Sequence, residues 1–180
     1  YAAAADLAAQ GHELRLWRRD AQAFAPVLHS QSIRLKDVNG ARSVRLALAT
    51  AEIGAALRDA ELVLVPTPAT AQADVARAMA PHLERGQVVF CPPGTFGSYV
   101  MAKIVRAAVR TAGTADISFA ETGTLPYLAR KHAPDEIAIT IRAKRLPVGV
   151  FPAQRTQAAL EVIRRAYPAV HPIEDALAAA

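Results

Sequence analysis

The side chains best placed for chemistry in this chain stand directly after short apolar runs that have the character of buried strands. Arg18 and Arg19 follow the run that ends at Trp17. Ligands of parallel α/β sheets bind beyond the carboxyl ends of the strands, where an acid binds an adenosine 2′-hydroxyl and an arginine accommodates a 2′-phosphate. Arg18 and Arg19 therefore favour NADP(H) as the cofactor, with NAD(H) as the alternative. A solvated turn, or binding of a 2′-hydroxyl by Asp20, also agrees with the sequence.

Pro66, Thr67 and Pro68 follow a second apolar run, Leu62–Val65. The two prolines remove backbone donors and restrict the loop, so this segment suits a stiff apolar wall beside a nicotinamide or a ribose. A rigid turn between a strand and a helix explains the same residues equally well. Pro66, Thr67 and Pro68 are therefore candidate cofactor contacts.

A glycine-containing loop follows the third apolar run, Val88–Cys91. Gly94 allows the backbone to come close to a ligand, and Ser98 is expected to cap a helix whose amino end favours anions. Pro93, Gly94 and Thr95 are therefore candidate contacts of a substrate that carries a carboxylate.

Glu121 follows the fourth apolar run, Ile117–Ala120, and is a candidate to position a cofactor hydroxyl; a surface loop acid is the common alternative. The five histidines are dispersed and lack the close partners of a metal site, so no metal is expected. Cys91 closes a buried run and is most simply a core residue.

The elements that would carry these residues alternate along the chain between strands and helices. Apolar positions recur with helical spacing over residues 70–83, 98–110 and 154–165. The four apolar runs, of which the first spans residues 13–17, are short and read as strands. Alternation of this kind predicts an α/β fold with a mostly parallel sheet.

Two stretches break this alternation. Residues 32–48 contain two short extended runs around Asn39 and Gly40, a strong hairpin signal because both residue types tolerate positive φ. Residues 136–142 alternate between apolar and polar side chains, and a further apolar run, residues 146–151, follows across a basic turn. We expect these two runs to form an antiparallel pair added to the parallel sheet.

The first residues read as a helix that is already under way. Residues 1–10 have no strand before them, and Gly11 follows where a left-handed backbone ends a helix. Helix, glycine and strand are the second half of a βαβ unit, so we expect a Rossmann-type doubly wound sheet whose first strand and glycine-rich loop are missing from the chain before Tyr1. Residues 1–152 would form this dinucleotide-binding domain, and residues 153–180 a connecting helix and the start of an absent helical domain. A flavodoxin-like or regulatory module without a nucleotide site is the alternative.

Composition restricts the class of protein. The chain has 180 residues, of which 52% are hydrophobic and 21% charged, and this excludes an intrinsically disordered protein. One cysteine excludes a disulfide framework and favours a reducing, cytoplasmic location. No apolar stretch reaches about 18 residues, so no membrane span is expected. The net charge of +5 is scattered and not interleaved with aromatic residues, so we expect small anionic ligands and no nucleic acid.

Five strings carry a family resemblance: YAAAADLAAQGHELRLWRRD (residues 1–20), VPTPATAQ (65–72), PGT (93–95), AETGTLPY (120–127) and KRLPV (144–148). The string AETGTLPY is the most specific of them, whereas the first twenty residues alone match many Rossmann enzymes. On these strings the chain resembles the octopine/nopaline (opine) dehydrogenase family over essentially its whole length.

The resemblance implies a two-domain enzyme, with an N-terminal Rossmann domain for NAD(P)H and a C-terminal helical domain that carries the catalytic histidine outside this chain. Such enzymes reduce the imine formed between an amino acid and a 2-oxo acid, so these small molecules are the expected partners, and a homodimer is compatible with the family. Gln72 stands where a histidine is expected and Pro92 where an asparagine is common, which leaves the substrate contacts open. A glycerol-3-phosphate dehydrogenase-like or ketopantoate reductase-like carbonyl reductase and a non-catalytic NADP-sensing module are the alternatives.

Overall fold

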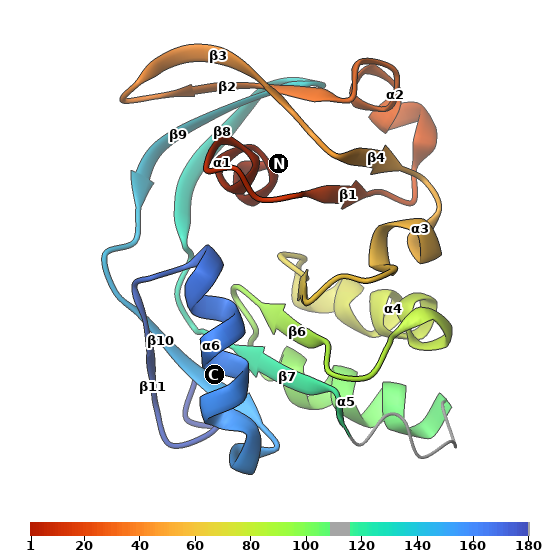
Figure 1. The fold of residues 1–180 in the computed structure, drawn as a ribbon, viewed down its shortest axis with the longest axis vertical. Helices are drawn as coiled ribbons and strands as arrows, with labels where there is room; N and C mark the ends of the chain where they lie inside the picture. The colour runs from red at the N-terminus through yellow and green to blue at the C-terminus, as the bar shows by residue number, and fades with distance from the viewer. Residues whose placement is uncertain (109–115, 180) are drawn as a thin grey trace. The chain divides into compact units, whose positions relative to one another are not determined.

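The computed structural model describes residues 1–108 and 116–179, which form two compact units (Figure 1). Unit 1 consists of residues 1–56 and 127–142, and unit 2 of residues 57–126 and 143–180. The chain therefore leaves unit 1, builds most of unit 2, returns for one hairpin and then completes unit 2. Among the residues described, no helix is both long enough and apolar enough to span a membrane.

Unit 1 contains a two-stranded parallel sheet and a four-stranded mixed sheet. The small sheet pairs β1 with β4, and the strand order in the larger sheet is β3-β2-β9-β8. The short helix α3 (Ile53–Leu57) lies at the boundary of the two units. The other elements of unit 1 are α1 (Ala2–Ala9), β1 (Arg15–Trp17), α2 (Ala21–Ser30), β2 (Ser32–Asp37), β3 (Gly40–Arg45), β4 (Leu48–Thr50), β8 (Tyr127–Ala133) and β9 (Glu136–Arg142).

Local sequence signals explain two turns of unit 1. Gly11 follows α1 with a φ of +93°, and the N–H groups of Gly11 and His12 donate to carbonyl oxygens in the last turn of that helix. Gly40 also has a φ of +93°, and it forms the last pair of the β2–β3 hairpin with Asp37. The predicted helix end and the predicted hairpin are both confirmed.

The core of unit 1 is built from one face of each helix and the inward face of the strands. Alanines on α1 allow a close approach to the four-stranded sheet, and Figure 1 shows α1 beside β8 and β9. The two inward isoleucines of β9 lie in this core, as their alternation predicts. The buried cluster consists of Ala4, Ala5, Phe24, Val27, Ile33, Leu35, Val44, Leu46, Ala49, Ile137 and Ile139.

Unit 2 is a five-stranded sheet of order β11-β10-β7-β6-β5, in which β5, β6 and β7 are parallel. Helix α6 contacts β6, β10 and β11, while α5 contacts α4, β6 and β7, and Figure 1 shows α6 on the opposite side of the sheet from α4 and α5. The elements are β5 (Leu62–Leu64), α4 (Ala69–Met79), η1 (Ala80–His82), β6 (Val88–Cys91), α5 (Gly97–Ala108), β7 (Ser118–Glu121), β10 (Leu146–Phe151), η3 (Ala153–Arg155), α6 (Thr156–Ala166) and β11 (Val170–Pro172).

The predicted α/β fold with a parallel sheet and an added antiparallel pairing is confirmed. The strands β1, β5, β6 and β7 lie within two residues of their predicted bounds, and Val88–Cys91 matches in full. Helix α5 ends at Ala108 in the structure, and the predicted helical positions 109 and 110 lie outside the described residues. The first strand expected before Tyr1, and the assignment of residues 153–180 to a further domain, stay predictions; in the structure α6 and β11 belong to unit 2.

The partners of the antiparallel pairing differ from the prediction. Residues 136–142 and 146–151 form strands β9 and β10, but β9 pairs with β8 and β10 pairs with β7. Strand β8 was missed because Arg130, Lys131 and His132 hide its apolar pattern. A short turn joins β8 to β9, so closing this hairpin costs little entropy, and β9 pairs with β8 in preference to β10.

Candidate functional site

The carboxyl end of β1 places Arg18 and Arg19 where the sequence predicts them. Parallel pairing continues one residue past the strand, since the Arg18 N–H donates to the Thr50 carbonyl oxygen at 3.2 Å. Arg19 is exposed, and Arg18 is half-buried with its guanidinium carbon 5.6 Å from the centre of the Tyr1 ring. Among the described residues, neither arginine forms an ion pair.

The acid that follows these arginines has another task in the structure. Asp20 is the N-cap of α2, and its Oδ1 accepts the Ala23 N–H at 3.0 Å. The end of β1 thus presents two guanidinium groups, which are donors only, beside an acid that has one oxygen engaged as a helix cap. This donor set fits the phosphate of a 2′-phosphorylated ribose better than a ribose hydroxyl.

A second cation lies beside the ring of Tyr1. Lys131, on β8, has its Nζ 4.4 Å from the centre of the Tyr1 ring. Sequence analysis did not single out Lys131, because the strand that positions it was not recognised. Tyr127, Ala129 and Ala133 alternate with polar or exposed residues, and this pattern, interrupted only by Lys131 itself, identifies the strand in retrospect.

In unit 2, Glu121 holds the loop that follows β6. Its side chain is fully buried, its Oε1 accepts the Phe96 N–H at 3.0 Å and its Oε2 accepts the Ser98 N–H at 2.7 Å. The amino end of α5, which we expected to attract a substrate carboxylate, therefore already binds the carboxylate of Glu121. A direct contact between Glu121 and a cofactor hydroxyl stays a prediction.

The predicted cap of α5 is wrong. Ser98 lies inside the helix, fully buried, and its Oγ has no hydrogen-bond partner among the described residues. The carboxylate of Glu121 displaces it from this role, because a charged acceptor that reaches two N–H groups is stronger than a single hydroxyl. The sequence separation of Glu121 from α5 concealed this contact.

The glycines of this loop make room for the protein's own side chains. A Cβ at Gly94 would collide with the Glu121 side chain, and a Cβ at Gly97 would collide with Gln72. The amide of Gln72 is buried and donates from Nε2 to the Gly94 carbonyl oxygen at 2.9 Å. The close approach that the sequence assigned to a ligand at Gly94 is thus made by Glu121, and the roles of Pro93, Gly94 and Thr95 toward a substrate stay predictions.

The proline-rich loop joins β5 to α4. The Val65 N–H donates to the Phe90 carbonyl oxygen at 2.8 Å, and Pro68 is the N-cap residue of α4. Pro66 and Pro68 are exposed, whereas the Thr67 Oγ1 is buried and has no hydrogen-bond partner among the described residues. An unpartnered buried hydroxyl at the carboxyl end of a parallel strand fits a position where a ligand completes the hydrogen bonding.

Neither the thiol of Cys91 nor a cluster of potential metal ligands forms a further site among the described residues. Cys91 is fully buried with its Sγ 3.4 Å from the Met101 Sδ, which confirms its assignment to the core. Burial, with a smaller effect of the nearby Glu121 charge, raises the pKa of the Cys91 thiol to about 12. Over residues 1–108 and 116–179, no three His, Cys, Asp or Glu side chains gather as metal ligands.

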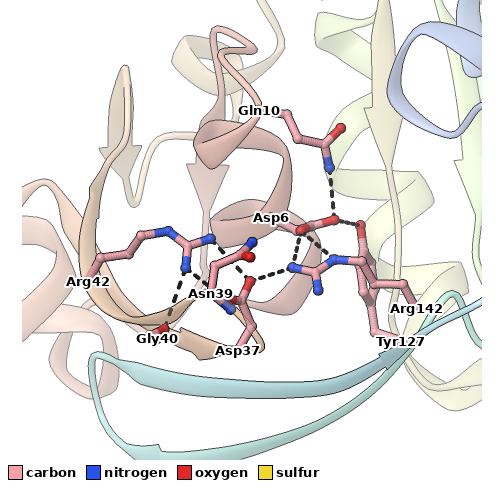
Figure 2. Close-up of polar contacts among 8 residues, drawn as sticks. All are labelled: Asp6, Gln10, Asp37, Asn39, Gly40, Arg42, Tyr127 and Arg142. Atoms are coloured by element: carbon pink, nitrogen blue, oxygen red, sulfur yellow. Dashed lines mark hydrogen bonds and ion pairs between the residues drawn. The ribbon is translucent and has the colours of Figure 1, made fainter.

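Unit 1 also contains a buried ionic cluster that sequence analysis missed (Figure 2). Arg142 of β9 donates to Asp6 Oδ1 of α1 from Nε at 2.8 Å and from Nη2 at 2.6 Å, and its Nη2 donates to Asp37 Oδ2 of β2 at 2.7 Å. Asp37 also binds Arg42 through both carboxylate oxygens. Tyr127 and Gln10 complete the hydrogen bonds of Asp6, each at 3.0 Å.

The cluster fixes α1 against the four-stranded sheet. Hydrogen bonds from Arg42 and then Arg142 lower the pKa of Asp37, and the hydrogen bonds that Arg142 donates to Asp6 and then to Asp37 raise the pKa of Arg142. The side chains of Asp6 and Asp37 are 7% and 0% exposed, so both carboxylates depend on these partners. The helix that carries Tyr1 beside Arg18 is therefore held by charge as well as by packing.

Comparison with known proteins agrees with this arrangement. A curated opine dehydrogenase from Arthrobacter sp. (strain 1C) is 27% identical over 177 residues, which are 98% of this chain and 48% of that protein. The structure of octopine dehydrogenase with NADH and L-arginine superposes with a TM-score of 0.76 at 18% identity, covering 97% of this chain and 46% of that one. Yersinopine dehydrogenase with NADP+ has a TM-score of 0.71 at 15% identity, covering 98% of this chain and 45% of its own. The chain thus spans about half the length of these relatives.

The fold is the Rossmann-type fold shared with the octopine dehydrogenase structure, and the likeness confirms the predicted resemblance to opine dehydrogenases. The family model for ketopantoate reductase PanE/ApbA matches residues 2–138. The chain belongs to this family.

Proposed function

We propose that this chain is the dinucleotide-binding part of an NADP(H)-dependent dehydrogenase of the opine dehydrogenase type, in which Arg18 and Arg19 bind the 2′-phosphate. The observation that carries the proposal is the pair of arginines at the end of β1, which form no ion pair among the described residues while Asp20 is engaged as a helix cap. Relatives solved with NADH and with NADP+ support a nicotinamide cofactor in general.

The remaining candidate residues have narrower roles in this proposal. Pro66, Thr67 and Pro68 contact the nicotinamide side of the cofactor, and the unpartnered Thr67 hydroxyl supports a hydrogen bond to it. Pro93 to Thr95 border the substrate on a loop whose shape Glu121 maintains. When bound, NADPH supplies the hydride that reduces the imine of an amino acid and a 2-oxo acid. This chain's residues bind and orient, and none of them is proposed as the catalytic acid or base.

Cofactor titration tests the assignment of the 2′-phosphate. We expect the full-length protein to bind NADPH more tightly than NADH, as measured by the fluorescence of the reduced cofactor. Arg18→Ala should weaken NADPH binding about tenfold or more and leave NADH binding unchanged, because only NADPH carries the extra phosphate. The matched control is Arg45→Ala, which removes an exposed arginine of β3. If NADH binds as well as NADPH and Arg18→Ala changes neither, the assignment is wrong.

A second candidate function is reduction of a carbonyl without an amine, as in a ketopantoate reductase-like enzyme, and the match to that family model favours it. The two functions differ in their need for an amine. Oxidation of NADPH that requires both an amino acid and a 2-oxo acid supports imine reduction, whereas oxidation with ketopantoate alone supports the second candidate. Intact NADPH binding without oxidation by either substrate set points to a non-catalytic sensing module.

A further inference from the structure

Lys131 occupies an inward position on β8 where the alternation of the strand would place an apolar side chain. Tyr127 and Ala129, four and two residues before it, pack against the core of unit 1 on the side of α1. Arg130 lies on the opposite face, and both Arg130 and Lys131 are exposed to solvent. Sheet pairing becomes irregular directly after Lys131, between Lys131 and Ala133. Lys131 therefore shares the face of Tyr127 and Ala129, while its ammonium group remains accessible to a ligand.

Lys131 and Arg18 both place a cation near the ring of Tyr1. The Lys131 Nζ lies 4.4 Å from the centre of the Tyr1 ring, and the guanidinium carbon of Arg18 lies 5.6 Å from the same centre. Two cations from opposite ends of unit 1 in the sequence thus meet at one aromatic ring. Both side chains are long and can swing toward a common ligand.

Within the described residues, no carboxylate forms an ion pair with either of these two cations. The charge of Lys131 contributes to lowering the pKa of Asp135, but the main cause is Arg34, which donates to both Asp135 oxygens at 3.0 and 2.8 Å. The amino end of α1 carries partial positive charge and does not stabilise cations either. An anion that both side chains reach would therefore be attracted by two positive charges.

We propose that Lys131 is a second cation for the 2′-phosphate of NADP(H), acting with Arg18, and that it contributes to the preference for NADP(H) over NAD(H). A phosphate monoester carries a charge of about −1.5 to −2 near pH 7, so a single arginine leaves it incompletely neutralised. Lysine supplies a compact charge that complements the planar guanidinium of Arg18. This inference rests on the proposed function, since it assigns a further residue to the same cofactor site.

The test compares Lys131→Gln with Arg130→Gln in the full-length protein, by titration with NADPH and with NADH at low and high salt. The two variants remove equal charge from adjacent positions on opposite faces of β8. We expect Lys131→Gln to raise the Kd for NADPH about tenfold, the loss of one charge-assisted hydrogen bond, to leave the Kd for NADH unchanged and to weaken the salt dependence of NADPH binding. Lys131→Arg should retain NADPH binding, and Arg130→Gln should resemble the wild type.

Other outcomes would contradict either the role of Lys131 or the proposed function. Equal weakening of NADPH and NADH by Lys131→Gln would place Lys131 at a group that both cofactors share, and no change in either would remove it from the site. If Arg130→Gln has the same effect as Lys131→Gln, the effect is one of net charge and the proposal is wrong. A wild-type protein that binds neither cofactor would overturn the proposed function itself, whereas NADPH binding that is lost in Arg18→Ala but unaffected by Lys131→Gln overturns only this inference.

Discussion

Replacement of Arg142 by leucine tests whether the buried ionic cluster holds unit 1 together. The substitution removes the guanidinium group that lies between Asp6 and Asp37 and leaves an apolar side chain in its place. Arg142 makes three hydrogen bonds to these two carboxylates, at 2.8, 2.6 and 2.7 Å. We expect the variant to fold and to have a lower free energy of unfolding than the wild type.

The size of the loss follows from what each carboxylate retains. Asp37 keeps its two hydrogen bonds from Arg42, whereas Asp6 keeps only the neutral donors of Tyr127 and Gln10. A hydrogen bond to a charged group contributes about 1.5–3 kcal/mol, and water replaces part of this because the Arg142 side chain is 35% exposed. We therefore expect a loss of about 2 kcal/mol, which lowers the urea midpoint by about 1 M.

Urea unfolding followed by the fluorescence of Trp17 measures this loss, because Trp17 is the only tryptophan of the 180 residues and lies in unit 1. Arg34→Leu is the matched control. Arg34 also binds two carboxylates from the same sheet, those of Asp135 and Glu136, but its side chain is 53% exposed, so its removal should cost much less. If Arg142→Leu lowers the free energy of unfolding no more than Arg34→Leu does, burial does not increase the stabilising contribution of the cluster and the reasoning is refuted.

Three further outcomes follow from the buried polar groups. Hydrogen bonds from neighbouring arginines lower the pKa of Asp37, so the stability that its carboxylate contributes is complete above the ordinary carboxyl pKa and is lost as the pH falls through the lowered value. The difference in unfolding free energy between wild type and Asp37→Asn should therefore shrink from pH 7 toward pH 2, and a constant difference would contradict this. Because the pKa of Cys91 is raised to about 12, a thiol reagent at pH 8 should label Cys91 only after unfolding, and rapid labelling of the native protein would count against its burial. Glu121→Gln replaces one acceptor by a donor, so the amides of Phe96 and Ser98 should exchange hydrogen about tenfold faster or more, in contrast to unchanged exchange if Glu121 is dispensable.

Elements with local signals were predicted well. The run Val88–Cys91 has only apolar side chains and becomes the fully buried β6. Asn39 and Gly40 identify the hairpin, and Gly11 identifies the end of α1, because each turn needs a backbone conformation that few residues adopt. Signals of this kind lie within a few neighbouring residues, so they can be read along the chain.

Contacts between distant segments were not predicted. Glu121 binds the N–H groups of Phe96 and Ser98 across more than twenty residues, and nothing near Glu121 in the sequence indicates a helix end. Asp6 lies in an alanine-rich helix, and it contacts Arg142 only because the chain returns to unit 1 with β9 after residues 57–126, which belong to unit 2. The pairings of β8 with β9 and of β10 with β7 were missed for a related reason, since strands compete for partners across the whole chain.

The sequence by itself determined the α/β class, the order of most elements and the place of Arg18 directly after a strand. Only the tertiary structure decided that Lys131 lies beside the same ring as Arg18, and that Glu121 occupies the amino end of α5. The physical reason is that periodicity records which side of one segment is buried, whereas the identity of the neighbour depends on how every segment packs.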